Sequence, residues 1–244
     1  MLPPRLLHMP SSLPQPDCPR IKYVHSFEEL VSTKFEDGVN ALCWARTLPG
    51  DFDEIVGQFN VKEGRLALDE ATLNGLVLSP AGQIARAILL ADRKALADHG
   101  LSPVLDCIHG YPRDEEGGPV ITDVYSFHVD SAPVEADTYL CSYNHTASEG
   151  LLNEEAVRKV DVPEIRAELL DLYGGEDDEE FEEFLSDNCF NLHYAPLPEA
   201  RPYFFGIGNL WRIAIAHPES LVPPCIHRAP VIEPGQPARL LLIS

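Results

Sequence analysis

The C-terminal part of the chain contains a series of short runs whose composition is typical of β-strands. The runs are rich in aromatic and branched apolar residues, and Pro, Gly and charged residues separate them. They are Tyr203–Phe205, Leu210–Ala216, Cys225–Arg228 and Arg239–Ile243. Short strands at close spacing are typical of sandwiches and barrels, so the sequence predicts a mainly β core.

The same reasoning predicts earlier strands, and helices come between them. Ser26 and Glu29 form a capping box that predicts a helix from Ser26 to Val31, and Asp51–Phe59 has helical spacing of its apolar residues. Strands are predicted at Val39–Arg46, Val104–His109, Tyr125–Asp130 and Asp137–Tyr143. The fold class predicted is therefore α+β, with helices before the main part of the sheet.

The clearest helix runs from Ser79 to His99. Ser79 is suited to the N-cap, Pro80 to the first helical position and Gly100 to the residue after the helix. An apolar stripe is predicted to pack against the sheet, formed by Ile84, Ala87, Ile88, Ala91, Ala95 and Leu96.

Residues 153–200 interrupt the β pattern and are acidic. Glu154–Tyr173 has a helical composition that Pro163 divides into two pieces, and Glu179–Phe184 continues it. The run Glu176–Glu183 indicates a solvated helix face, and we interpret the whole segment as a helical insert that forms a lid or a dimer surface. The formal net charge of −21 argues against nucleic acid and anionic membranes as partners.

Residues 1–20 contain six prolines and predict an extended arm, and residues 21–244 are expected to form one domain. The six cysteines show no CxxC spacing and no disulfide framework, which favours a reduced, cytoplasmic protein. No apolar stretch has the length that a membrane span requires.

The segment Tyr125–Asp130 carries the first candidate functional residues. Side chains two residues apart in a strand share a face, so His128 and Asp130 can reach one metal ion together. His227 is the candidate third ligand. Two histidines and one carboxylate are the ligand set of non-haem Fe(II) oxygenases.

A histidine followed two positions later by an acidic residue is expected by chance in a chain this acidic. Nine histidines, each with about a one-in-six chance of an acidic residue two places on, give roughly one or two accidental matches, and the chain contains two. The second is His217-Pro218-Glu219, whose prolines indicate a loop. Local structure therefore favours His128 and Asp130.

A hairpin at the C-terminus would add an arginine to these ligands. If Cys225–Arg228 pairs with Ala238–Ile243, His227 lies opposite Arg239 and both side chains share a face. A guanidinium there would bind a carboxylate with two parallel hydrogen bonds. The alternative is that Arg239 is a surface or ion-paired residue.

These residues resemble the pattern of the Fe(II)- and 2-oxoglutarate-dependent oxygenases, whose fold is a double-stranded β-helix of the jelly-roll type. The resemblance covers roughly residues 120–244, and Thr138–Leu140 and Ile226–Pro230 are also similar to a bacterial family of unassigned function. It implies that His128, Asp130 and His227 bind Fe(II) and that Arg239 binds the distal carboxylate of 2-oxoglutarate. Tyr139 is a further candidate for binding this co-substrate, with a core aromatic residue as the alternative.

The expected function is therefore oxidation of a small molecule. A homodimer is a possible oligomeric state. Two alternatives remain: a mononuclear metal enzyme on the same scaffold that does not use 2-oxoglutarate, and a non-catalytic barrel that binds a ligand or a partner. His145 and His193 are each predicted to be solvated loop residues, with a place in the site or its lid as the alternative.

Overall fold

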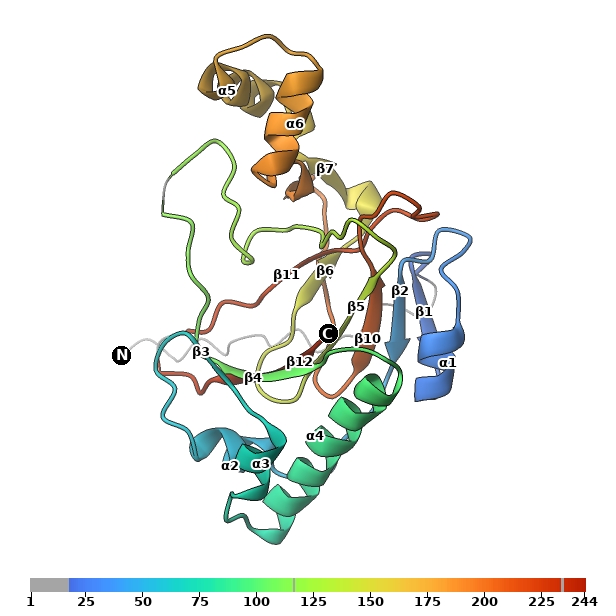
Figure 1. Cartoon of the computed structure of the whole chain (residues 1–244), viewed down its shortest axis with the longest axis vertical. Coiled ribbons are helices and arrows are strands. Elements are labelled where there is room, and N and C mark those ends of the chain that lie inside the picture. Colours follow the sequence, from blue (N-terminus) through green and yellow to red (C-terminus); the bar gives the residue numbers. More distant parts are fainter. Residues whose placement is uncertain (1–17, 116, 234) are drawn as a thin grey trace, which may run out of the picture.

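A computed structural model describes residues 18–115, 117–233 and 235–244. Most of the predicted arm at residues 1–20 therefore lies outside the described residues. The chain folds as an α+β protein with a core made mainly of sheet, as the sequence predicts (Figure 1).

The larger sheet has seven strands. Only β1 and β2 are parallel, and every other neighbouring pair is antiparallel. In spatial order the strands are β1 (Ile21–Val24), β2 (Ala41–Trp44), β10 (Leu210–Ala214), β5 (Asp137–Ser142), β12 (Arg239–Ile243), β4 (Val104–Ile108) and β3 (Arg65–Ala67).

The smaller sheet contains three strands: β11 (Ile226–Arg228), β6 (Glu149–Leu151) and β9 (Tyr203–Phe204). A buried apolar cluster joins it to one face of the larger sheet. Phe205 stacks on Trp211 at a ring-centroid distance of 4.5 Å, and Cys225 lies in the same cluster as Leu241. The space between the two sheets is therefore the place where residues from β5, β11 and β12 can meet.

Helices cover the other face of the larger sheet (Figure 1). They are α1 (Phe27–Ser32), α2 (Phe52–Gly57), α3 (Glu70–Asn74) and α4 (Pro80–Asp98). Ser26 caps α1, and Ser79 caps α4, which has Pro80 in its first turn and Gly100 after it at a φ of 87°, as the sequence predicts.

The predicted apolar stripe of α4 is wrong for Ile84, Ala87 and Ala91, which are exposed, and is confirmed for Leu96, which is buried. The buried face consists of Gly82, Ala85, Leu89, Asp92 and Leu96, and Ile84 is 47% exposed. An apolar pattern misses this face because it contains a glycine and a carboxylate, and the carboxylate of Asp92 is buried in an ion pair with Arg46 at 2.7 Å.

The insert at residues 153–200 forms a separate projection at one end of the molecule (Figure 1). Helices α5 (Pro163–Tyr173) and α6 (Glu179–Asp187) pack on each other around Leu169 and Phe181. The prediction of a helix from Glu154 is wrong for its first part, because the chain there forms η1 (Asn153–Glu155), β7 (Ala156–Arg158) and η2 (Lys159–Asp161). After α6 come η3 (Phe190–Leu192) and β8 (Tyr194–Pro196), which pairs with β7.

Two further predictions, a strand at Tyr125–Asp130 and a C-terminal hairpin, are wrong. Tyr125–Asp130 is not a continuous strand, because only His128 makes bridges, to His227 and His193. The predicted C-terminal hairpin is absent from the described residues: β11 pairs with β6, and β12 pairs with β4 and β5. His227 therefore lies opposite Gly150 and Arg239 opposite Ile108.

Candidate metal centre

Three side chains that could hold one metal ion meet at the edge of the smaller sheet. One ligand atom from each of His128, Asp130 and His227 lies within 4.8 Å of the others. Nε2 of His227 is 3.8 Å from Oδ2 of Asp130, and Nε2 of His128 is 4.0 Å from Oδ1. The structure thus brings together the three residues that the sequence singled out.

The backbone explains why the two imidazoles face each other. The N–H of His128 donates to the carbonyl of His227, and the N–H of His227 donates to the carbonyl of His128, both at 2.9 Å. Directly opposed residues of this kind present their side chains on the same face. The ring centroids are 4.6 Å apart.

Each imidazole is oriented by a carbonyl of its own segment. Nδ1 of His128 lies 2.8 Å from the carbonyl oxygen of Ser126, and Nδ1 of His227 lies 3.3 Å from that of Cys225. A carbonyl only accepts hydrogen bonds, so Nδ1 carries the proton in both rings. Nε2 is then left with its lone pair toward Asp130, which is how a histidine binds a metal.

The surroundings of His128 and Asp130 favour the protonation states in which these side chains bind a metal. Burial lowers the pKa of His128 to about 4, and the neighbouring His227 contributes to the same shift. Burial raises the pKa of Asp130, but His227, the Thr138 hydroxyl and His128 together hold that pKa below its usual value. At neutral pH His128 is therefore neutral and Asp130 ionised, the states that metal binding requires.

Thr138 of β5 fixes the carboxylate. Its hydroxyl donates to Oδ2 of Asp130 at 2.6 Å, which connects the larger sheet to the metal centre. The sequence resemblance includes Thr138 but gives it no role, because its contact with Asp130 depends on the packing of the two sheets.

We expect Thr138→Val to weaken metal binding about tenfold, because partners of ligand groups typically contribute a factor of about 10 to 100 in affinity. Anaerobic titration with Fe(II), or with Co(II) as a surrogate, measures this change. Thr47→Val is the control, since Thr47 is exposed. An unchanged affinity in Thr138→Val would remove Thr138 from the site.

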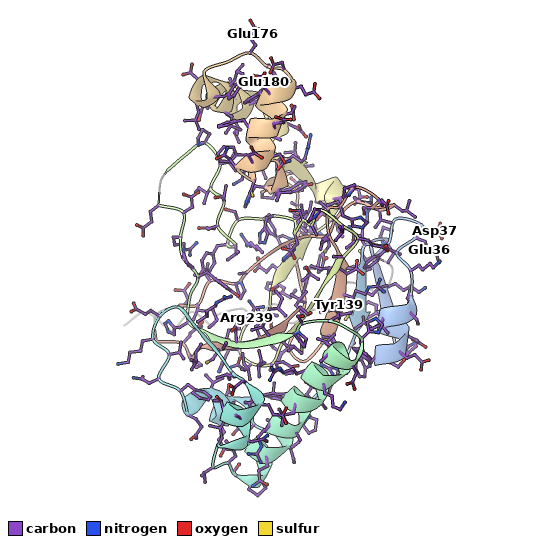
Figure 2. The ribbon with its side chains drawn as sticks, in the orientation of Figure 1. Glu36, Asp37, Tyr139, Glu176, Glu180 and Arg239 are labelled. Carbon is purple, nitrogen blue, oxygen red and sulfur yellow. The ribbon has the colours of Figure 1, made fainter. Side chains whose placement is uncertain are left out.

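Arg239 lies at the start of β12 and is 2% exposed, inside the body of the molecule and away from the acidic insert that carries Glu176 and Glu180 (Figure 2). Its Nη2 donates to the hydroxyls of Ser142 at 2.8 Å and Ser148 at 2.9 Å. Ser142 belongs to the larger sheet, and Ser148 immediately precedes β6 of the smaller one, so the guanidinium spans the space between the sheets.

No described carboxylate lies within ion-pair distance of Arg239, and Nη1 hydrogen-bonds to none of the described residues. Burial lowers the pKa of Arg239 to about 10, so the side chain is still charged at neutral pH. A buried charge without a counterion is costly, and such groups are normally paired. The position suits an anionic ligand.

Tyr139 is not brought to this site. It alternates with Thr138 along β5, so it faces the helices, where it is buried with Leu210 and lies near Arg212, whose guanidinium is 5.9 Å from the tyrosine ring. The alternative of a core aromatic residue is therefore the better description, and Tyr139 has no contact with the proposed ligand space.

Comparison with known proteins adds no relative. No family model, curated protein or solved structure matches this chain. Among the described residues, no helix has the length and apolar character needed to cross a bilayer.

Two histidines that the sequence left open have different positions. Nε2 of His145 lies 2.7 Å from Oδ1 of Asp53, at the side of the helices. His193 is only 4% exposed, so the prediction of a solvated loop residue is wrong for it. Its ring centroid lies 5.8 Å from that of His128, and burial lowers its pKa to about 4.

Proposed function

We propose that this protein is an Fe(II)- and 2-oxoglutarate-dependent oxygenase that acts on a small molecule. The observation that carries the proposal is the combination of the His128, Asp130 and His227 cluster with Arg239, a buried cation that lacks a carboxylate partner among the described residues. A metal cluster alone, or a buried arginine alone, would suit many kinds of protein. Together they supply a site for a metal and a site for a dicarboxylate between the same two sheets.

The order of the strands supports a double-stranded β-helix. In chain order the relevant segments are β4, the His128 segment, β5, β6, β9, β10, β11 and β12. In the larger sheet the neighbours are, in order, β4, β12, β5 and β10, which are the first, eighth, third and sixth of these segments. In the smaller sheet they are the His128 segment, β11, β6 and β9, which are the second, seventh, fourth and fifth. This is the order of two Greek keys wound into a jelly roll.

The donor set fits Fe(II). Two neutral imidazoles and one carboxylate leave further coordination positions open, which is the arrangement of non-haem Fe(II) oxygenases. One ligand atom from each of the three residues lies within 4.8 Å of the others, close enough for a single metal ion to be held by all three. When bound, the metal and the keto acid supply the oxidising chemistry, and the protein supplies binding, orientation and a dry space.

Arg239 is suited to bind the distal carboxylate of 2-oxoglutarate. Ser148, to which it donates, lies two residues before Gly150, the residue opposite His227. Two residues of strand span about 7 Å, a length comparable to that of a five-carbon dicarboxylate. The serine hydroxyls accept from Nε and Nη2 and hold the guanidinium in place, which leaves Nη1 to donate to a carboxylate.

The overall reaction consumes the substrate, 2-oxoglutarate and O₂. It yields hydroxylated substrate, succinate and carbon dioxide, with one oxygen atom of O₂ in the new hydroxyl group and the other in succinate. An apolar cluster that contains Phe205, Trp211 and Cys225 lies on one side of the site, and the ring centroid of Phe205 is 6.5 Å from that of His227.

Turnover of 2-oxoglutarate without added substrate tests the proposal. We expect Arg239→Leu to raise the KM for 2-oxoglutarate at least about 30-fold, because truncating one member of a buried charge pair costs about 2 kcal/mol or more. Succinate formation in the presence of Fe(II) and O₂ measures it. Arg228→Leu is the matched control, since Arg228 lies next to His227 in the chain and pairs with Glu149.

The results separate the three candidate functions of the site. Succinate formation that depends on His128 and Arg239 supports the oxygenase. Metal binding without affinity for 2-oxoglutarate would favour the metal enzyme that does not use the keto acid. Absence of metal affinity would favour the non-catalytic barrel and would contradict the proposal.

A further inference from the structure

His193 comes from the insert and lies beside the metal ligands. The N–H of Val129 donates to the carbonyl of Leu192 at 3.0 Å, and the N–H of Tyr194 donates to that of Phe127 at 2.8 Å. These bonds flank His128 and His193, which oppose each other directly and so share a face. His193, His128 and His227 thus form a row of imidazoles across three adjacent segments.

The ring nitrogens of His193 have no hydrogen-bond partner within the described part of the protein. Nδ1 is buried without a hydrogen bond, and no described residue hydrogen-bonds to Nε2. Leaving a buried polar group unpaired costs about 1–3 kcal/mol. His128 and His227 differ in this respect, because a backbone carbonyl accepts from Nδ1 of each. Nδ1 is enclosed by protein, so Nε2 is the nitrogen of His193 that a molecule bound beside the metal can reach.

A cavity of about 760 Å³ that is open to solvent lies between residues 112–115 and 118–123 on one side and the insert on the other. Its apolar wall contains Phe184 and Phe190, whose rings meet edge to face at 5.9 Å, together with Leu172 and Val120. The volume is that of a pocket for a small molecule. The aromatic wall suits a flat or branched apolar group.

Asp123 connects this cavity to the imidazole row. It lines the cavity, and its side chain is 6% exposed. Burial lowers the pKa of both His128 and His193, and Lys159 also lowers that of His193, whereas the charge of Asp123 raises the pKa of both. The same insert therefore provides one wall of the cavity and the unpartnered imidazole. A molecule held against Phe190 would lie near His193, three residues further along the chain.

The charges of the lining disfavour an anion. Arg113 is the only cation among the cavity's described lining residues, and it is neutralised by Asp123, 3.6 Å from Nη1 to Oδ2. Asp114 and Glu115 add two further carboxylates to the lining. Ammonium groups are attracted both by such carboxylates and by aromatic faces.

We propose that this cavity takes the substrate, a small neutral or cationic molecule with an aromatic or branched apolar body, and that His193 hydrogen-bonds to it and orients it beside the metal. The inference rests on the function proposed above. It makes the insert a determinant of substrate specificity and His193 a positioning residue.

Paramagnetic relaxation tests the inference without knowledge of the natural substrate. The full chain is loaded with Mn(II) and saturating 2-oxoglutarate, and the proton relaxation of benzylamine is compared with that of phenylacetate. We expect strong relaxation of benzylamine and little of phenylacetate. His193→Ala is expected to weaken benzylamine binding at least fivefold and His193→Gln to restore part of it, while the affinity for Mn(II) changes less than twofold. His25→Ala, at an exposed position, is the control.

The outcomes distinguish this inference from the proposed function. Absence of Mn(II) binding in the parent, or Mn(II) binding that survives His128→Ala, contradicts the metal centre itself. If Mn(II) binds but benzylamine relaxes equally in the parent and His193→Ala, the role of His193 is wrong. Equal relaxation of phenylacetate, or relaxation of neither probe, contradicts the assignment of the cavity. Retained Mn(II) affinity in His193→Ala shows that the variant is folded.

Discussion

Replacing His227 by alanine is expected to weaken Fe(II) binding at least about a hundredfold. The substitution removes one of three ligands, and it also leaves Asp130 with one neighbouring imidazole in place of two. Loss of a group that merely supports a ligand already costs a factor of about 10 to 100. Anaerobic titration of the parent and the variant with Fe(II), or with Co(II), measures the ratio.

His25→Ala provides the control for removing an imidazole, because His25 is exposed and comes directly after β1, far in the sequence from the ligands. His128→Ala should behave as His227→Ala does. Parental affinity in either ligand variant would mean that the metal, if any, binds elsewhere.

The second large effect is on stability. Asp92 of α4 accepts from Nη1 and Nη2 of Arg46 at 2.7 and 2.8 Å and from the hydroxyl of Tyr143 at 2.7 Å. Both charged side chains are 9% exposed. Asp92→Ala leaves the guanidinium buried without its partner, so we expect the free energy of unfolding to fall by about 3–5 kcal/mol. Urea denaturation followed by circular dichroism measures it.

Two comparisons identify the cause of that loss. Asp98→Ala breaks an exposed pair with Lys94 and should cost less than about 0.5 kcal/mol. The double variant Arg46→Met/Asp92→Leu removes both charges and should be more stable than Asp92→Ala. A double variant that is less stable than Asp92→Ala would show that the ion pair itself, and not the unpaired charge, accounts for the effect.

The local signals in the sequence were sufficient for several elements. Ser79, Pro80 and Gly100 fix the ends of α4 through the backbone groups that they satisfy or the conformation that they allow, and these effects are local. Most of the predicted strands also occur, because their composition matches burial on a sheet. The spacing of His128 and Asp130 correctly predicted that the two side chains lie close together, even though their segment is irregular and not a strand.

The remaining features depend on contacts between distant segments. The hairpin prediction failed because turn residues between β11 and β12 do not reveal that β12 joins the other sheet, between β4 and β5. Arg239 still reaches the space between the sheets, since the alternation of β12 places it with Leu241 on the inner face. Tyr139 faces the helices because it is the next residue after Thr138, and successive residues of a strand point to opposite faces of the sheet. His193 is buried because the insert folds back onto His128.

Visible absorption of the anaerobic protein tests the proposed metal and co-substrate site most directly. We predict that Fe(II) and 2-oxoglutarate together produce a broad charge-transfer band that neither produces alone. The band should be absent in His227→Ala and should require higher concentrations of 2-oxoglutarate in Arg239→Leu. A protein that binds Fe(II) but shows no band with 2-oxoglutarate, or an unchanged band in His227→Ala, would contradict the proposed function.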